Sequence, residues 1–176
     1  MMKIAITGPE STGKSILAEQ LAFHYHTAWV PEFARDYLAG IGRPYQEADI
    51  LSIAKGQLAA ETAKLEKAGG YLFCDTEFLV TKIWGEVKYG RSHPWIVEQL
   101  DQHKYDLYLL CNIDLPWEYD PLREHPNQRP YLFDLYFNDL KYRGFPFAVV
   151  SGTGLTRLNN AVQIIDDFFY DRSLSV

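Results

Sequence analysis

A phosphate-binding pattern stands near the start of the chain, where residues 8–15 read GPESTGKS. Two glycines separated by four residues and followed by Lys14 and Ser15 match G-x-x-x-x-G-K-S, the P-loop pattern. The glycines allow a tight turn that points several backbone N–H groups into one concavity, which suits phosphate oxygens. We expect Lys14 to reach the β- and γ-phosphates of ATP and the Ser15 hydroxyl to hold Mg²⁺. The predicted ATP-binding residues of this loop are Gly8, Glu10, Ser11, Thr12, Gly13, Lys14 and Ser15.

An acidic residue further along the chain extends this predicted site. Residues 71–74 read YLFC, a compact apolar run typical of an inner strand, and Asp75 follows directly. A carboxylate at the end of a strand behind a P-loop is the Walker B arrangement, and it would hold Mg²⁺ directly or through water. Thr76 stands where many motor and AAA-type ATPases carry a water-activating glutamate. This favours phosphoryl transfer to a bound acceptor, although Glu77, one position later, weakens the point.

Three charged residues follow a second short apolar run, residues 29–31. They are Glu32, Arg35 and Asp36. Because ligands of open α/β sheets sit outside the carboxyl ends of the strands, we expect these residues to face a bound substrate. The alternative is that they form the solvated first turn of a helix, where acidic residues are also favoured.

Residues 120–130, DPLREHPNQRP, differ in composition from the rest of the chain. They contain three prolines, two arginines and almost no apolar side chain, so we expect an exposed, mobile flap. A lid that carries arginines can close over the γ-phosphate of a phosphoryl-transfer enzyme, offset its charge and exclude water. Arg123 and Arg129 are the predicted lid arginines. The alternative is an ordinary loop with solubilising charge.

Alternating strand and helix patterns must position these residues. We expect strands near residues 3–7, 29–31, 71–74, 106–111 and 147–151. We expect helices near residues 16–23, 47–67, 78–89, 94–100, 131–143 and 158–169. This alternation predicts an α/β fold, a three-layer P-loop NTPase with a five-stranded, mainly parallel sheet in one domain over residues 1–176. Gly152 and Gly154 follow the last strand. Either they admit an adenine ring on which Arg157 stacks, or they only make the turn.

The composition restricts the classes of partner. The chain has 176 residues, 47% hydrophobic and 23% charged, which is globular and enough for one domain with a substantial core. A formal net charge of −6 argues against a nucleic-acid-binding surface. Cys74 and Cys111 lie in apolar runs and are expected to be buried and reduced, which fits a cytoplasmic protein. We see no signal peptide and no apolar run long enough to span a membrane. The sequence leaves a homo-oligomer open.

Five sequence blocks together resemble a known family. In chain order they are GPESTGKS at 8–15, VPEFARDY at 30–37, DTEFLVT at 75–81, LLCNIDLPWEYDPLR at 109–123 and VVSG at 149–152. They are similar to the ribosylnicotinamide kinase domain of the bifunctional bacterial NAD-biosynthesis proteins, which is grouped with AAA-like ATPase domains. The likeness covers nearly the whole chain. Its P-loop is unspecific, whereas the VPEFAR and DLPWE blocks are much more telling.

The resemblance implies a nucleoside- or nucleotide-kinase-like fold with a lid at about residues 120–130. It also implies transfer of the γ-phosphate of ATP to the 5′-hydroxyl of nicotinamide riboside. Glu32 would accept the hydroxyl proton, Arg35 would hold that carboxylate or the substrate, and Asp75 would serve Mg²⁺, the acceptor or both. The implied catalytic residues are Lys14, Glu32, Arg123 and Arg129, and the implied substrate-binding residues are Glu32, Arg35, Asp36, Asp75, Trp84 and Trp117. The two tryptophans are chosen because their rings could stack on nicotinamide.

The chain departs from the family pattern in several places. It contains no H-x-G-H signature of an adenylyltransferase and no helix-turn-helix pattern, so neither adenylyl transfer nor repression is expected of it. Asp120-Pro121 replaces the Asp-Gly expected at the lid entry. Two alternatives stay open. One is a kinase for another nucleoside or nucleotide, and the other is a P-loop ATPase that acts as a switch on a protein partner.

Overall fold

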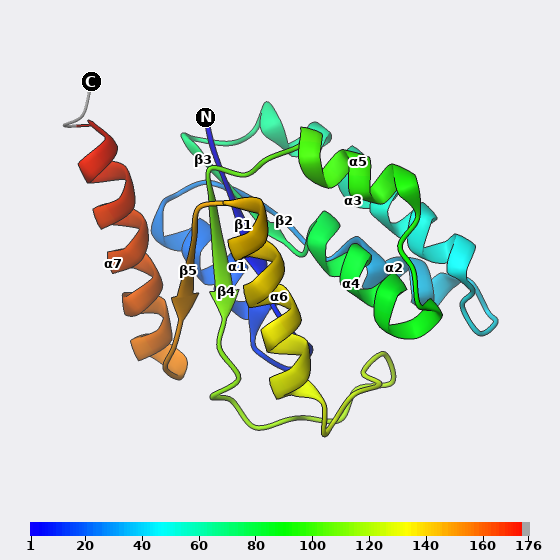
Figure 1. Ribbon diagram of the computed structural model, residues 1–176. Coiled ribbons are helices and arrows are strands. Elements are labelled where there is room, and N and C mark those ends of the chain that lie inside the picture. The colour runs from blue at the N-terminus through cyan, green and yellow to red at the C-terminus, as the bar shows by residue number, and fades with distance from the viewer. Residues whose placement is uncertain (174–176) are drawn as a thin grey trace.

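The computed structural model describes residues 1–173, with side chains through Tyr170. Within this part of the chain, five parallel strands form one sheet in the order β2-β3-β1-β4-β5 (Figure 1). The strands are β1 (Met2–Thr7), β2 (Ala28–Val30), β3 (Tyr71–Asp75), β4 (Leu107–Cys111) and β5 (Phe147–Val150).

The central strand is β1, and its place in the sheet explains its sequence. Ile4, Ala5 and Ile6 are fully buried, because strands flank β1 on both sides and helices cover both faces. The register pairs Ile6 with Asp75 of β3. Since parallel strands end at the same edge, the loop after β1 and the carboxylate that ends β3 meet at the carboxyl edge of the sheet, as the sequence predicts.

Helices cover both faces of the sheet and make three layers. One face packs against α1 and α7, whose core residues include Leu17, Leu21 and Ile165. The opposite face packs against α3, α4, α5 and α6 (Figure 1). The helices are α1 (Lys14–His24), α2 (Phe33–Gly40), α3 (Glu47–Leu65), α4 (Phe78–Tyr89), α5 (Pro94–Gln102), α6 (Arg129–Arg143) and α7 (Gly154–Ser173).

The predicted fold class is confirmed, and one boundary is wrong in a way that matters. We define the lid loop as residues 112–128, which join β4 to α6 without a helix or strand. The sequence extends the predicted lid through residue 130, but α6 begins at Arg129. The reason is Pro130, which suits the first turn of a helix because its fixed φ is already helical and its missing N–H needs no partner there.

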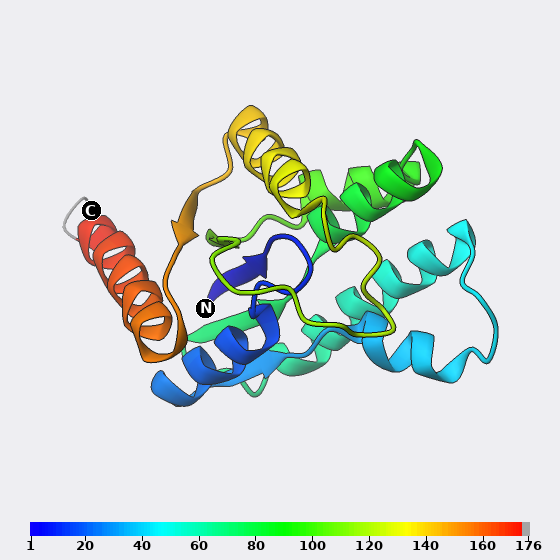
Figure 2. The ribbon, with the colours of Figure 1, turned by 90° about the horizontal axis from the view of Figure 1, so that it is seen from below.

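The lid loop runs across the P-loop. Figure 2 shows it crossing in front of the loop after β1 and continuing towards α2. Ser11 lies beneath it, where its hydroxyl accepts a 2.9 Å hydrogen bond from the Glu118 backbone N–H. The expected exposed flap therefore packs on the phosphate-binding loop, although many of its side chains remain exposed.

Two further sequence predictions can be compared with residues 1–173. Cys74 and Cys111 are both buried and free, as expected. No helix in this range has the length and apolar character to cross a membrane.

Candidate functional site

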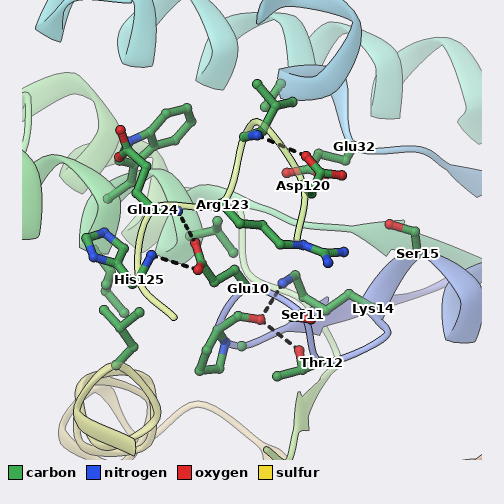
Figure 3. Close-up of a pocket in the computed structure, with 18 of the residues that line it drawn as sticks. Glu10, Ser11, Thr12, Lys14, Ser15, Glu32, Asp120, Arg123, Glu124 and His125 are labelled. Atoms are coloured by element: carbon green, nitrogen blue, oxygen red, sulfur yellow. Dashed lines mark hydrogen bonds between the residues drawn. The ribbon is translucent and has the colours of Figure 1, made fainter. Parts of the chain in front are cut away.

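The P-loop adopts a conformation that its sequence requires. Gly8 has φ of 128°, and a Cβ there would lie 3.1 Å from the Cys111 carbonyl oxygen, so glycine alone fits both the angle and the space. Thr12 Oγ1 and Lys14 Nζ each donate a 2.7 Å hydrogen bond to the Pro9 carbonyl oxygen. Lys14 thus bends back over the loop, and its ammonium lies at the concavity that the motif predicts for phosphate (Figure 3).

Asp75 is the most deeply buried acidic group near the P-loop. It is fully buried, and neither carboxylate oxygen has a hydrogen-bond partner within the described part of the chain. Burial, and next the negative charge of Glu32, raises the pKa of Asp75 to about 6. The nearby hydroxyl of Ser15 and the charges of Lys14 and Arg35 oppose this rise.

These residues fit a magnesium ion. Unpaired, buried carboxylate oxygens beside a hydroxyl are hard oxygen ligands of the kind that Mg²⁺ prefers. No group of three or more His, Cys, Asp or Glu side chains within the described residues could hold a metal alone. This agrees with the usual magnesium site of phosphate-binding proteins, in which one or two carboxylates act together with substrate phosphates. Ser15 and Asp75 are the residues that would hold the ion.

Buried Asp75 should make the stability of the protein depend on pH. Its pKa in the folded state, about 6, lies above the ordinary aspartate value of 3.8, so the native state binds the proton more tightly than the unfolded state does. Stability therefore falls as the pH rises from about 4 to about 6, by about 3 kcal/mol at about 1.4 kcal/mol per pKa unit. The stability of Asp75→Asn relative to wild type should grow by this amount between pH 4 and pH 8.

Denaturant unfolding at a series of pH values measures this difference. Asp36→Asn is a matched control, because Asp36 is an exposed carboxylate on the same side of the sheet. A relative stability of Asp75→Asn that stays constant from pH 4 to pH 8 would contradict the raised pKa.

Glu32 and Arg35 enter the site from the start of α2. Glu32 is the N-cap residue of this helix, yet its side chain makes no capping hydrogen bond and lines the cavity described below. Arg35 Nε lies 4.0 Å from Glu32 Oε2, and Arg35 NH1 donates a 2.9 Å hydrogen bond to Asp120 Oδ2 of the lid loop. Asp36 is exposed and does not line the cavity, so its position matches the solvated helix turn.

A cavity of about 420 Å³ joins the P-loop to Glu32 and Arg35, and its lining includes neither Asp36 nor Asp75. The P-loop forms one side, α2 and α4 form the far walls, and the lid loop forms the roof (Figure 3). This volume lies within the usual range for small-molecule sites. Of the predicted residues outside the P-loop, Glu32, Arg35, Trp84 and Arg123 line the cavity. Figure 3 shows Arg123 extending from the lid loop towards Lys14.

Arg129 and Trp117 also lie outside the cavity lining. Arg129 NH1 donates to the carbonyl oxygens of Ser11, at 3.0 Å, and Leu115, at 2.8 Å. Arg129 therefore holds the P-loop backbone, in place of the predicted position over the γ-phosphate. Trp117 is also outside the cavity lining, because its indole N–H donates a 3.0 Å hydrogen bond to Glu10 Oε1.

Arg157 is buried among backbone carbonyls, in contrast to the predicted stacking on adenine. It is 4% exposed. Its guanidinium donates to the carbonyl oxygens of Thr12 at 2.6 Å, Gly152 at 2.8 Å and Asn112 at 3.0 Å, and it pairs with the Asp114 carboxylate. Arg157 thus ties the P-loop to the loops after β4 and β5.

Several cavity residues are absent from the sequence predictions. From the lid loop, Asp120, Glu124 and His125 line the cavity. Their role depends on how the lid loop docks, for which the sequence carries no local signal. The apolar wall of the cavity leaves a pattern in the sequence, because its residues on α4 repeat at helical spacing after Asp75. The same pattern is equally typical of a helix packed against the core. Besides the predicted Trp84, the apolar lining residues include Ile16, Ala34, Leu38, Val80, Ile83, Val87, Leu122, Leu132 and Tyr136.

The fold and the site define a class of protein. A five-stranded parallel sheet, a P-loop after its central strand and a buried aspartate after the adjacent strand together define a P-loop nucleotide-binding protein. A sequence profile of the family described as "AAA domain" matches residues 3–157. The chain belongs to this AAA domain family.

Sequence relatives point to the same group as the five sequence blocks. The chain is 34% identical over 124 residues to the trifunctional NAD biosynthesis/regulator protein NadR of Salmonella typhimurium. The protein of the same name from Escherichia coli strain K12 shows the same identity over the same length. Each match covers 68% of this chain and 30% of the relative, so the chain spans less than a third of these proteins. The predicted resemblance is confirmed.

Solved structures share the fold. A crystal structure of a NadR protein in complex with NR has a TM-score of 0.76 at 22% identity, covering 95% of this chain and 51% of that one. Deoxyadenosine kinase from M. mycoides with bound dATP has a TM-score of 0.61 at 17% identity, covering 94% and 100%. Thymidylate kinase from Ehrlichia chaffeensis has a TM-score of 0.62 at 14% identity, covering 93% and 98%. At these identities the likeness concerns the fold alone.

Proposed function

We propose that this chain is an ATP-dependent kinase that transfers the γ-phosphate to the 5′-hydroxyl of a nucleoside. The observation that carries the proposal is the placement of Glu32 on the cavity that Lys14 and the P-loop also line. A phosphate-binding loop alone would serve many NTPases. A partly exposed carboxylate on the same cavity provides a place for an acceptor hydroxyl.

The donor half of the site consists of the P-loop and its neighbours. The backbone N–H groups at the start of α1 and the Lys14 ammonium would bind the phosphates of ATP. Mg²⁺ held by Ser15 and Asp75 would offset the negative charge of those phosphates. Arg123 on the roof would approach the γ-phosphate from the opposite side.

The acceptor half lies between α2 and α4. Glu32 would accept a hydrogen bond from the 5′-hydroxyl and receive its proton during transfer. Arg35, held between Glu32 and Asp120, would keep the Glu32 carboxylate in place. The apolar wall, with Trp84, would pack against the base. The bond that forms joins the acceptor oxygen to the γ-phosphorus, and the bond that breaks leaves ADP.

Nicotinamide riboside is the acceptor that we propose first. Support comes from the sequence relatives named for NAD biosynthesis and from the NadR structure in complex with NR. In this proposal the chain acts as one kinase domain on a small molecule, with no nucleic-acid partner. A cytoplasmic location agrees with the free, buried Cys74 and Cys111.

A screen of acceptors tests the proposed function. The purified chain is incubated with MgATP and one nucleoside at a time, including nicotinamide riboside, and the product mass is determined. We expect ADP formation that depends on nicotinamide riboside and a product heavier by one phosphoryl group. Phosphorylation of another nucleoside instead would overturn the proposed acceptor. Slow ATP hydrolysis that no nucleoside accelerates would overturn the kinase and favour a nucleotide-dependent switch.

Glu32→Gln should slow phosphoryl transfer without preventing ATP binding. We expect kcat to fall about 10²-fold, at the low end of general-base effects, because the transition state of phosphoryl transfer is loose and needs little proton removal. Single-turnover kinetics at saturating acceptor measures the change, and calorimetric titration with a non-hydrolysable ATP analogue serves as the control. Full turnover by the Glu32→Gln variant would show that Glu32 is not the base.

A further inference from the structure

The Glu10 side chain joins the P-loop to the lid loop through three hydrogen bonds. Glu10 Oε2 accepts the Glu124 backbone N–H at 2.9 Å, and Oε1 accepts the His125 backbone N–H at 2.8 Å. The indole N–H of Trp117 donates to the same Oε1 at 3.0 Å. Figure 3 shows the two backbone contacts as dashed lines from the lid loop to Glu10.

A carboxylate at this position requires explanation. The P-loop is built to bind anions, and a free negative charge beside it would repel the triphosphate. The three donors of the lid loop satisfy the Glu10 carboxylate, and hydrogen bonds of this charge-assisted kind are about twice as strong as neutral ones. The closed lid loop therefore offsets a charge that an open lid loop would leave facing the nucleotide.

These contacts hold the backbone of the lid loop next to Arg123. The two backbone N–H groups that Glu10 binds belong to the residues directly after Arg123. On the other side, the Leu122 N–H donates to Asp120 Oδ1 at 2.9 Å, and Arg35 holds the same carboxylate from α2. The backbone on both sides of Arg123 is thus tied to an acidic side chain.

We propose that Glu10 is a positioning residue that docks the lid loop on the P-loop and so places the Arg123 guanidinium over the phosphates. The placement of Arg123 over the phosphates rests on the proposed kinase function. The docking of the lid loop on the P-loop does not, because it is a property of the protein without nucleotide. Glu10 acts through Arg123 and takes no part in proton or phosphoryl transfer.

Amide hydrogen exchange tests the docking directly. In wild type without nucleotide, the Glu124 and His125 amides should be protected. In Glu10→Ala both should exchange about 10-fold faster or more, the factor expected from loss of a hydrogen bond to a charged group. Glu19→Ala is the matched control, because it removes an exposed carboxylate from α1 without touching the lid loop. Equal exchange of the two amides in wild type and Glu10→Ala would overturn the proposal.

Kinetics in two backgrounds tests the positioning role. Glu10→Ala should lower kcat about 10²-fold, as expected when a reacting group is displaced by about 1 Å. The KM for ATP should not rise, because a repulsive charge is also lost. In an Arg123→Ala background the same substitution should have almost no further effect on kcat, since the two residues act as a unit. Glu10→Gln, which keeps one carbonyl acceptor, should recover part of the activity.

The outcomes separate this proposal from the proposed function. An equal loss of kcat in both backgrounds would mean a general structural role and would overturn the positioning of Arg123. A wild-type chain that phosphorylates no acceptor would overturn the kinase, and the exchange of the two amides would still decide whether Glu10 docks the lid loop.

Discussion

Arg123→Ala lowers kcat about 10³- to 10⁵-fold, the range known for arginines that stabilise phosphoryl-transfer transition states. Arg123 lines the cavity and points towards Lys14. In the transition state, negative charge spreads over the oxygens of the transferring group. A fixed positive charge in a site that excludes water stabilises that distribution far more than water would. Single-turnover transfer at saturating MgATP and acceptor is the measurement.

Two variants control this result. Arg123→Lys keeps the charge but loses the planar fork of donors, so its kcat should lie between those of wild type and alanine. Arg91 is an exposed arginine outside the cavity lining, and its Nε lies 2.7 Å from Glu47 Oε1. Arg91→Ala should leave kcat unchanged. A kcat of Arg123→Ala within tenfold of wild type would remove Arg123 from the reaction.

Lys14→Ala lowers kcat about 10³-fold and also weakens ATP binding. In other enzymes, removal of one preorganised hydrogen-bond donor that faces the charge developing in the transition state lowers kcat about 10²- to 10³-fold. We expect a loss of similar size here. In the proposed mechanism Lys14 would contact the phosphates in both the ground state and the transition state, so its removal, unlike that of Arg123, should raise the dissociation constant for MgATP. Calorimetric titration with an ATP analogue and steady-state kinetics measure the two effects.

Two controls accompany the Lys14→Ala variant: a measurement of its melting temperature and a second variant that lacks a different lysine. The Lys14 ammonium hydrogen-bonds a backbone carbonyl of its own loop, so Lys14→Ala should keep the melting temperature close to that of wild type. Lys67→Ala removes an exposed lysine beyond the end of α3 and should change neither ATP affinity nor kcat. Wild-type ATP affinity in Lys14→Ala would contradict phosphate binding at this loop.

Local patterns were sufficient to predict the layers of this fold. Each strand is a short apolar run, and the three inner strands are almost wholly buried. Each long helix carries an apolar stripe, so elements such as Phe78–Tyr89 could be predicted to the residue. The P-loop and Asp75 could be predicted because their chemistry depends on neighbours within the same segment. Because parallel strands have their carboxyl ends at the same edge of the sheet, the P-loop and Asp75 then lie together at that edge.

Side-chain direction and long-range docking could not be predicted in this way. A positive charge suits phosphate at Arg129, and stacking on adenine is one of the two alternatives open for Arg157, yet both guanidinium groups bind backbone carbonyls. Glu10 was assigned to ATP as part of the motif, but its partners lie 107 to 115 residues later in the chain. Such pairings depend on how loops pack after the sheet has formed, and no periodicity in the sequence records them.

The guanidinium of Arg157 has a consequence for how the protein is made. It holds the Thr12 carbonyl oxygen across a separation of 145 residues. During synthesis the P-loop leaves the ribosome before α7 does, and domains generally fold as units. The loop therefore waits for α7 to be translated before its backbone is clamped. A nascent chain that ends before residue 157 contains every residue of the phosphate-binding motif but lacks the group that holds the motif in shape. Nucleotide binding should then begin only after residue 157 has left the ribosome.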